Sequence, residues 1–222
     1  MENKVLDAFN KASTDYDKYR KQAIPNMEIY YNTAIKLTQK YENPEILDLG
    51  AGTGILTQLI HNQHPQSNIT LVDLSTEMLK IAKEKFKDKN FKYIEADYLK
   101  YEFKNKYDII VSSLSIHHLT DKEKQELYKK IYEMLKPNGI FINADQVRGS
   151  TEYTEQTYKK QDETHLKKQD IPEEEKEILR NRRKLDKPAT LKDTLQWYEE
   201  IGYKNVDIYY KYYRYIVIAG EK

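Results

Sequence analysis

Residues 46–54 read ILDLGAGTG, an apolar run that passes directly into three closely spaced glycines. Ile46–Leu49 is short and apolar enough for a buried strand, and a helical pattern follows through about His61. Glycine permits positive φ angles and lets the backbone come within van der Waals distance of a ligand. A glycine-rich loop between a strand and a helix N-terminus is typical of nucleotide sites in parallel sheets. The alternative is a tight strand–helix turn without a ligand.

The same alternation of apolar runs and helical patterns continues to residue 146. Further strands are predicted at Ile69–Leu74, Phe91–Ile94, Tyr107–Val111 and Ile140–Ala144. Two of the helices between them are marked clearly, one by the capping residue Ser75 and one over Lys122–Leu135 that ends at a KPNG turn, residues 136–139. Strands separated by helices form right-handed βαβ units. We therefore expect an α/β fold with a doubly wound, mostly parallel sheet.

Three segments flank this core, and a chain of 222 residues suits a single domain. Residues 1–43 are predicted to form N-terminal helices, 44–146 the ligand-binding α/β core, 149–187 a helical lid insertion and 190–222 a C-terminal helix and β-hairpin. The two hairpin strands, Val206–Tyr210 and Tyr213–Ala219, are joined too tightly for a helical crossover. They must therefore pair antiparallel.

Composition excludes several classes of function. The chain has 37 Lys and Arg against 36 Asp and Glu, so its net charge of +1 gives no global attraction to nucleic acid. It has no cysteine, which removes disulfides, a thiol nucleophile and Cys-ligated zinc. No apolar stretch is long enough for a membrane span, and the first 30 residues hold no signal-peptide core. We expect a soluble cytoplasmic protein without a membrane or nucleic-acid partner.

Three aspartates stand at the ends of successive predicted strands. Ile55 takes the place of the last glycine in the dinucleotide fingerprint, and Asp48 precedes the glycines, where it would repel a pyrophosphate and attract a cation or ammonium group. Asp73, at the end of the second strand, can accept both hydroxyls of a ribose. Asp97 follows the third strand and can receive an adenine amino group. Together they favour a nucleoside ligand that carries positive charge.

These features resemble the class I (Rossmann-like) S-adenosylmethionine (SAM)-dependent methyltransferases over roughly residues 43–144. Residues 46–54 match the family's first motif, residues 136–140 match its late turn and fifth strand, and the hairpin matches its sixth and seventh strands. The resemblance implies a seven-stranded sheet with an antiparallel C-terminal pair, SAM as cofactor and S-adenosylhomocysteine (SAH) as product. It also implies cofactor contacts by Asp48, Gly50, Ala51, Gly52, Asp73, Leu74, Asp97, Tyr98 and Ser113.

The N-terminal segment carries a second resemblance. Tyr16-Asp17-x-x-Arg20 is similar to a pattern that many small-molecule SAM methyltransferases place over the cofactor. It implies that Tyr16 covers the methionyl group and that Arg20 pairs with its carboxylate. The alternative is an ordinary amphipathic helix.

Candidate catalytic residues follow the fourth and fifth strands. In SSLSIHH, residues 112–118, either His117 or His118 can act as a base or orient the substrate. The alternative is that they cap or pack beside the next helix. Asp145 stands at the same edge, where it can bind substrate or Arg148. With the two histidines and His165 it would offer ligands for a divalent cation, but nothing in the spacing demands one, so we expect no metal.

Other residues are assigned structural roles. His61 and His64 are predicted at the surface, and most of the twenty tyrosines are predicted to pack the core and the hairpin. Residues 173–184 run from acidic to basic, as the helix dipole favours, which requires no nucleic acid. The lid insertion offers scattered apolar anchors, namely Tyr153, Tyr158, Leu166, Ile178 and Leu179.

The sequence therefore predicts a SAM-dependent methyltransferase that acts on a small molecule under a helical lid, as a monomer or homodimer. Direct in-line displacement needs neither a covalent intermediate nor a metal. Two alternatives stay open. One is a methyltransferase that acts on protein or RNA, and the other is a non-catalytic SAM-binding sensor or partner subunit.

Overall fold

The computed structural model describes residues 16–222, and for Tyr16 the backbone alone. The predicted N-terminal helices therefore fall partly outside the described residues. In chain order the elements are α2 (Tyr16–Ala23), α3 (Met27–Lys36), β1 (Glu45–Leu49), α4 (Ile55–Gln63), β2 (Asn68–Asp73), α5 (Thr76–Lys85), β3 (Lys92–Glu95), β4 (Tyr107–Ser113), the 3-10 helix η1 (Ile116–His118), α6 (Asp121–Met134), β5 (Leu135–Gln146), α7 (Glu152–Lys167), α8 (Glu173–Arg183), α9 (Leu191–Ile201), β6 (Lys204–Tyr212) and β7 (Tyr215–Glu221).

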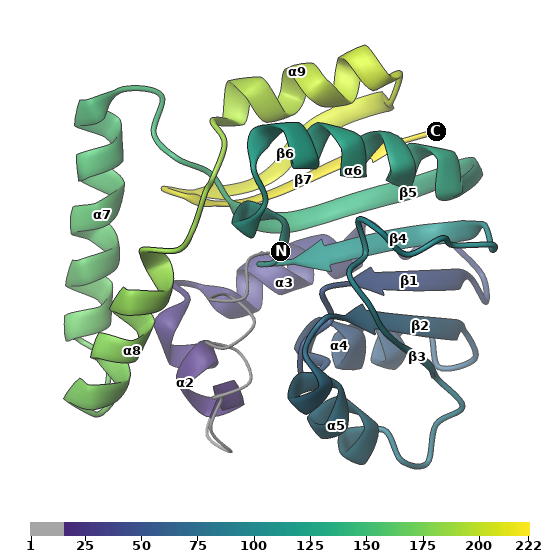
Figure 1. The fold of residues 1–222 in the computed structure, drawn as a ribbon, viewed down its shortest axis with the longest axis horizontal. Helices are drawn as coiled ribbons and strands as arrows, with labels where there is room; N and C mark the ends of the chain where they lie inside the picture. Colours follow the sequence, from purple (N-terminus) through teal and green to yellow (C-terminus); the bar gives the residue numbers. More distant parts are fainter. Residues whose placement is uncertain (1–15) are drawn as a thin grey trace.

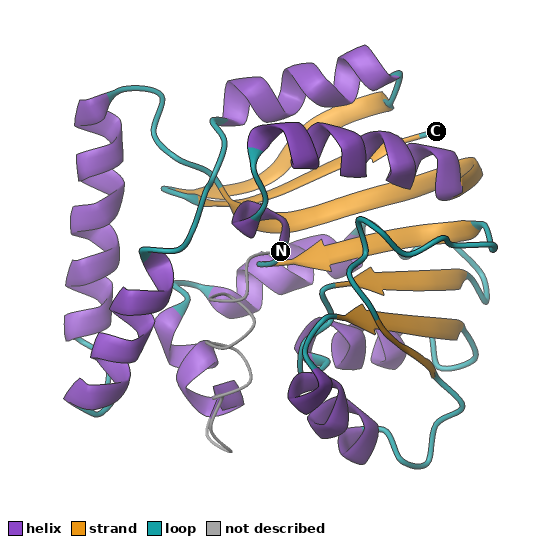
Figure 2. Cartoon of the chain, in the orientation of Figure 1, coloured by secondary structure: helices purple, strands orange, loops and turns teal. Residues whose placement is uncertain are grey.

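One seven-stranded sheet runs through the molecule in the order β3-β2-β1-β4-β5-β7-β6 (Figures 1 and 2). The pairs from β3 to β5 are all parallel, whereas β7 pairs antiparallel with both β5 and β6. The order reverses between β1 and β4, which is the point where doubly wound sheets bind ligands at the carboxyl ends of their strands. The predicted fold and the antiparallel C-terminal pair are confirmed.

Both faces of the sheet are buried, because neighbouring strand residues point to opposite sides. Ile46 and Ile109 belong to one apolar cluster, which includes side chains of α3, α4 and α5. Leu47 and Ile110 belong to the other, which includes side chains of α6 and α9. Figure 1 shows the same two helical layers. The second cluster holds the fully buried Tyr128, so the prediction that tyrosine rings fill the core is confirmed at this position.

The prediction that the KPNG segment, residues 136–139, is a turn before the strand is wrong in one respect. The helix does end before it, at Met134, but β5 already begins at Leu135, which pairs with Tyr107. The register then shifts, and the next paired residue of β5 is Ile140, opposite Ile109. Asn138 adopts a φ of 63° within this irregularity. The segment is therefore a bulge at the start of a long strand.

The segment predicted as a helical insertion forms α7 and α8, which lie beyond the carboxyl ends of β1, β2 and β4 (Figure 1). Leu166 is fully buried there and clusters with Ala23 and Ile171, so it is an anchor as predicted. Tyr153 is 81% exposed and Ile178 is 39% exposed, so the prediction that these two side chains anchor the insertion is wrong.

The surface placement predicted for two histidines is also wrong. His61 is buried and packs edge-on against Phe91, with 5.2 Å between ring centroids. His64 is buried as well, and its Nε2 lies 2.8 Å from the Thr38 hydroxyl. Phe91 and Thr38 come from distant parts of the chain, so the local pattern around the histidines does not report their burial.

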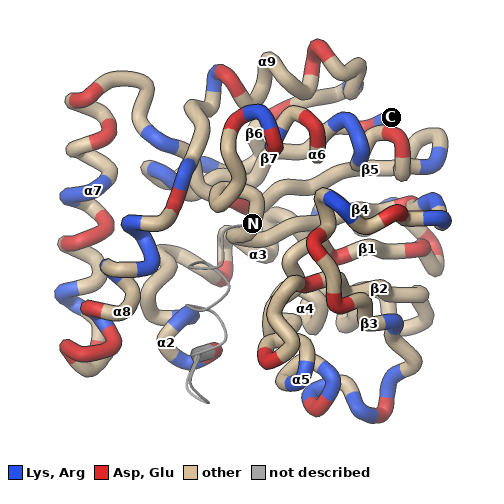
Figure 3. Tube along the Cα trace, in the orientation of Figure 1, with Lys and Arg blue, Asp and Glu red and all other residues tan. Residues whose placement is uncertain are grey.

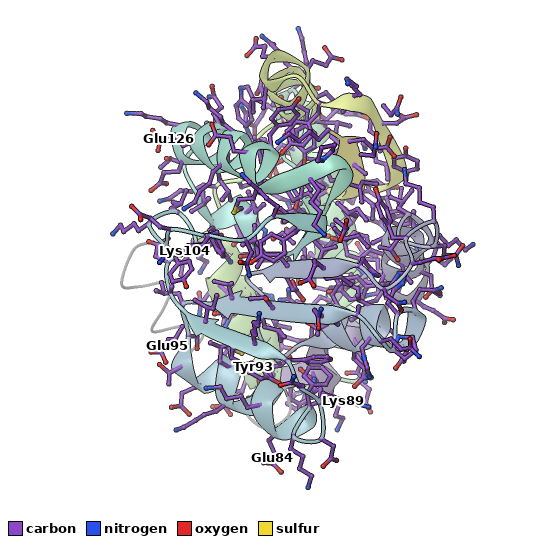
Figure 4. All side chains as sticks on the ribbon, turned by 90° about the vertical axis from the view of Figure 1, so that its right-hand side faces the viewer. Glu84, Lys89, Tyr93, Glu95, Lys104 and Glu126 are labelled. Carbon is purple, nitrogen blue, oxygen red and sulfur yellow. The ribbon has the colours of Figure 1, made fainter. Side chains whose placement is uncertain are left out.

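Charges of both signs are spread along the chain trace (Figure 3). Figure 4 views the molecule from the right-hand side of Figure 1, and the exposed Glu84 and Glu126 extend outwards from the ribbon. Among residues 16–222, no helix has the length and apolar character needed to cross a membrane.

Candidate active site

The glycine loop connects β1 to α4, and two of its glycines are required for different reasons. Gly50 has a φ of +70°, and a Cβ there would lie 2.0 Å from the Ser115 Oγ. Gly52 has a φ of +55°, but a Cβ there would meet no atom within 4 Å. Packing against the segment after β4 therefore requires glycine at position 50. Glycine at position 52 keeps a left-handed backbone beside open space.

A cavity of about 690 Å³, its open mouth included, lies against this loop. Nine of the predicted cofactor contacts line it, namely Arg20, Asp48, Gly50, Ala51, Gly52, Asp73, Leu74, Tyr98 and Ser113. Asp97 is not among its lining residues, and its Oδ1 accepts the Leu99 amide at 3.0 Å. The side chain of Tyr16 lies outside the described residues. Most of the residues predicted from separate strand ends therefore meet at one cavity.

Asp48 is the most deeply buried acid of the cavity, at 1% exposure. Its Oδ2 accepts the Thr57 hydroxyl at 2.5 Å, whereas its Oδ1 has no hydrogen-bond partner among the described residues. Burial raises the pKa of Asp48 to about 7. A buried carboxylate oxygen without a donor is rare in folded proteins, and a donor group of a ligand in the cavity would satisfy it.

Asp73 is held in a fixed orientation at the end of β2. The Gly52 amide donates to its Oδ2 and the Ser75 amide donates to its Oδ1, each at 2.8 Å. Burial raises the pKa of Asp73, against the effect of these amides. Ser75 also caps α5 by accepting from the Met78 amide, as predicted. The loop, β2 and α5 are thus joined through one carboxylate.

The helix α2 is tied to the glycine loop by Asp17, a residue of the Tyr16-Asp17-x-x-Arg20 pattern for which the sequence predicts no role of its own. Its Oδ1 accepts the Thr53 hydroxyl at 2.5 Å, and its Oδ2 lies 2.7 Å from the Lys85 Nζ. Lys85 also donates to the Thr53 carbonyl at 2.7 Å. These contacts hold α2 over the mouth of the cavity, one turn before Arg20.

A second cavity adjoins the first and shares Arg20, Leu114 and His118 with it. The other lining residues come from α2, η1, α8, the segments that follow α2 and α8, and the strands β5 and β7. They are Ala23, Ile24, His117, Gln146, Leu179, Arg182, Arg183, Asp186 and Tyr215. Three arginines and two histidines face a single acid, Asp186. This second cavity therefore favours an anionic ligand.

His117 stands between two carboxylates at the side of the second cavity. Its Nδ1 lies 2.5 Å from the Asp145 Oδ1, and its backbone N–H donates to the Asp145 Oδ2 at 3.0 Å. Its Nε2 lies 3.4 Å from the Asp186 Oδ1. Burial alone would lower the pKa of His117, but the two carboxylates raise it to about 9. The same interactions hold the pKa of Asp186 below its usual range despite burial.

His118 faces both cavities, and burial together with the charge on His117 lowers its pKa. The structure thus brings His117, His118 and Asp145 together, as their positions after β4 and β5 predict. His165 lies elsewhere, where its Nε2 contacts the Gln22 carbonyl at 2.8 Å. Asp186 takes the place that His165 had in the predicted group. It follows a helix of the insertion, and no motif around it signals this position.

Part of the chain is similar in sequence to known methyltransferases. Residues 46–139 match a family described as "Methyltransferase domain". Malonyl-[acyl-carrier protein] O-methyltransferase 2 of Ilyobacter polytropus is 33% identical over 140 residues, which cover 63% of this chain and 52% of the relative. The malonyl-[acyl-carrier protein] O-methyltransferase of Priestia megaterium is 32% identical over 146 residues, which cover 64% of this chain and 52% of the relative. The chain thus spans about half the length of these curated relatives.

Two solved structures share the fold over nearly their full length. The N-methyltransferase NodS of Bradyrhizobium japonicum, in complex with SAH, has a TM-score of 0.69 at 14% identity, with 98% of each chain covered. The magnesium protoporphyrin IX methyltransferase of Synechocystis, with bound SAM, has a TM-score of 0.64 at 12% identity, with 99% of this chain and 96% of its own covered. The chain therefore has the fold of these SAM-dependent methyltransferases, and its residues 46–139 match a methyltransferase domain.

Proposed function

We propose that the protein transfers a methyl group from SAM to a small-molecule acceptor that carries an anionic group. The observation that carries this proposal is the pair of adjoining cavities, one at the glycine loop and one lined by arginines. The first has the size and the acids of a nucleoside site, and the second supplies positive charge beside it. Their shared residues, Arg20, Leu114 and His118, mark the place where the methyl group would pass.

The residues of the first cavity fit SAM. The absence of a side chain at Gly52 leaves open space in the cavity, which a bound cofactor would fill. The Asp48 Oδ1, which has no hydrogen-bond partner among the described residues, suits the ammonium group of the methionyl end. Asp73 retains lone pairs for ribose hydroxyls in addition to the two amides it already accepts. Arg20 lines the same cavity, where it would pair with the methionyl carboxylate. The roles of Tyr16 and Asp97 remain predictions from the sequence resemblance.

The charge of the second cavity supports an anionic acceptor. Arg182 and Arg183 come from α8, so the insertion predicted as a lid would supply acceptor contacts. The curated relatives are named for O-methylation of a malonyl group, which carries a carboxylate. A carboxylate has no proton to lose near neutral pH, so its methylation requires no general base.

The chain's own task is positioning. Bound SAM supplies a methyl group that its sulfonium already activates. The protein must hold the acceptor atom in line with the methyl carbon and the sulfur and exclude water. His118 faces both cavities and would orient the acceptor, whereas His117, fixed by Asp145, would contribute positive charge. These three residues are therefore proposed as positioning and substrate-contacting groups.

Calorimetry with SAH and a transfer assay test the proposal. We expect SAH binding by the purified protein, and release of SAH from SAM with small carboxylates but not with their methyl esters. Arg182→Gln should raise the acceptor KM at least tenfold and leave the SAH affinity unchanged. Arg148→Gln is the matched control, since Arg148 lies outside both cavities.

The outcomes separate the alternatives. Absence of SAH binding by folded protein would refute the cofactor assignment. SAH binding without turnover across a broad acceptor panel would favour the sensor or partner subunit. Transfer to protein or RNA, and not to small carboxylates, would favour the macromolecular acceptor.

A further inference from the structure

A compact cluster of two histidines and one carboxylate lies between η1 and the segment after α8. The His117 Nε2 and the His118 Nδ1 lie 3.4 Å and 3.3 Å from the same oxygen, the Asp186 Oδ1. One ligand atom from each residue lies within 4.8 Å of the other two. We infer that His117, His118 and Asp186 form a binding site for a divalent transition-metal ion such as Zn²⁺.

The spacing of these atoms suits an ion. Zinc binds imidazole nitrogen and carboxylate oxygen at about 2.0–2.2 Å, which places neighbouring ligands about 3.4 Å apart in a tetrahedral arrangement. Both measured distances to the Asp186 oxygen agree with this value. Small side-chain adjustments therefore complete the site.

The orientation of His117 supports the same conclusion. Its Nδ1 faces Asp145 at 2.5 Å, and Asp145 is itself fixed by the His117 backbone N–H. Histidine ligands usually donate their second ring N–H to such a carboxylate, which leaves the other nitrogen free to bind the metal. Here that other nitrogen is Nε2, which faces Asp186. A bound cation would take the place of a proton between these two groups.

Burial and backbone contacts hold the cluster together. The side chains of His117, His118 and Asp186 are 4%, 6% and 6% exposed. The Lys187 amide donates to the His117 carbonyl at 2.8 Å, so the chain next to Asp186 is fastened to η1. The ion would thus join the insertion to the edge of the sheet.

The donor set indicates the class of metal. Imidazole nitrogens suit zinc, cobalt, nickel and iron, whereas magnesium and calcium prefer oxygen ligands alone. Three protein ligands leave a coordination position open, as in catalytic zinc sites. All three residues line the second cavity, so the open position faces it and suits an anionic oxygen. The inference replaces the expectation of a metal-free protein, and ion binding itself does not depend on the proposed function.

The test is a Zn²⁺ titration of protein prepared without a histidine tag and stripped with a chelator. We expect one Zn²⁺ per chain by elemental analysis, with an affinity measured by competition against a chromogenic chelator. Asp186→Asn and His118→Gln should weaken binding at least 100-fold. Asp145→Asn removes only the negative charge beside the His117 Nδ1 and should weaken binding about tenfold to 100-fold. His165→Gln is the matched control and should bind as the wild type does.

Cobalt provides a readout that needs no variant. Co²⁺ added to the stripped wild type should give visible absorption bands of a nitrogen- and oxygen-ligated site, and Zn²⁺ should abolish them. Failure of the wild type to bind either ion, or equal affinity in Asp186→Asn with an unchanged circular dichroism spectrum, would overturn the inference. SAH calorimetry on stripped protein separates the two ideas. SAH binding without metal binding refutes the ion site alone, and metal binding without SAH binding refutes the proposed function alone.

Discussion

The Asp17 carboxylate accepts a 2.5 Å hydrogen bond from the Thr53 hydroxyl, which joins the helix α2 to the glycine loop. The same carboxylate pairs with Lys85 of α5. Three elements that are distant in sequence therefore meet at one side chain. The consequence is that the loop and the helix carrying Arg20 keep a fixed relation at the mouth of the first cavity.

Replacing Asp17 by alanine removes both contacts. Hydrogen bonds to charged groups contribute about 1.5–3 kcal/mol, and partial exposure of Asp17 reduces this to about 1 kcal/mol. We expect SAH binding about fivefold weaker by calorimetry, since about 1.4 kcal/mol corresponds to tenfold. Lys18→Ala changes an exposed residue of the same helix and should leave the affinity unchanged. Equal affinities of the two variants would mean that α2 does not organise the loop.

Arg20 lines both cavities, so its removal should affect cofactor and acceptor together. For Arg20→Ala we expect SAH affinity to fall at least tenfold and the acceptor KM to rise. Arg20→Lys keeps the charge but loses the planar fork, so it should recover only part of the SAH affinity. An unchanged SAH dissociation constant in Arg20→Ala would refute the pairing with the methionyl carboxylate.

The fold and the first cavity could be predicted because their signals are local. The apolar run before Gly50, the acid two residues earlier and Asp73 at the next strand end all follow from short stretches of sequence. Parallel strands then bring their carboxyl ends to one edge of the sheet. Ser75 likewise carries its own capping signal, and its contact with the Met78 amide confirms it.

The second cavity could not be predicted in the same way. Asp186, Arg182 and Arg183 reach it because α7 and α8 fold back over the strand ends, and no periodicity in a highly charged segment reports that path. The burial of His64 depends on Thr38 from the segment after α3, which its own neighbours do not reveal. Long-range packing, and not local propensity, determines these positions.

Gly50 and Gly52 should respond differently to alanine. A Cβ at position 50 would lie 2.0 Å from the Ser115 Oγ and 2.5 Å from its Cβ, so Gly50→Ala should unfold at a markedly lower temperature. At position 52 a Cβ meets no protein atom, so Gly52→Ala should lose SAH affinity more than stability, with about 1 kcal/mol of backbone strain. Thermal melts and calorimetry measure the two effects. The reverse order of melting temperatures would contradict the packing described at the loop.

The buried ion pair between Arg214 and Asp162 fastens α7 to the C-terminal hairpin. The Arg214 Nε lies 2.7 Å from the Asp162 Oδ2, and both side chains are less than one tenth exposed. Arg214→Ala leaves a buried carboxylate without its cation, and we expect a loss of about 3–5 kcal/mol in the free energy of unfolding. The double variant with Asp162→Leu and Arg214→Met should lose much less, because the buried carboxylate is removed together with the cation that pairs with it.

Urea unfolding measures these differences, and Arg180→Ala is the control. Arg180 also belongs to an ion-pair group on the insertion, with Glu163 and Glu173, but that group is more exposed. Its loss should scarcely move the midpoint. A double variant as unstable as Arg214→Ala would show that the pair itself, rather than the unpaired charge, supplies the stability.

The raised pKa of Asp48 makes folding stability depend on pH. Burial moves this pKa from 3.8 to about 7, so the folded chain binds the proton more tightly than the unfolded chain. The stability associated with that proton is fully present below pH 3.8 and is lost as the pH rises through 7. Relative to Asp48→Asn, which does not titrate, the wild type should lose up to about 1.4 kcal/mol per pH unit in this window.

Urea unfolding of both proteins between pH 4 and pH 8 checks this dependence. Subtracting the free energy of unfolding of Asp48→Asn from that of the wild type removes the contribution of every other titrating group that the two proteins share. A constant difference would mean that Asp48 is ionised in the folded chain throughout. A donor would then have to reach its Oδ1, which has none among the described residues, so the cavity would have to be arranged differently at its deepest point.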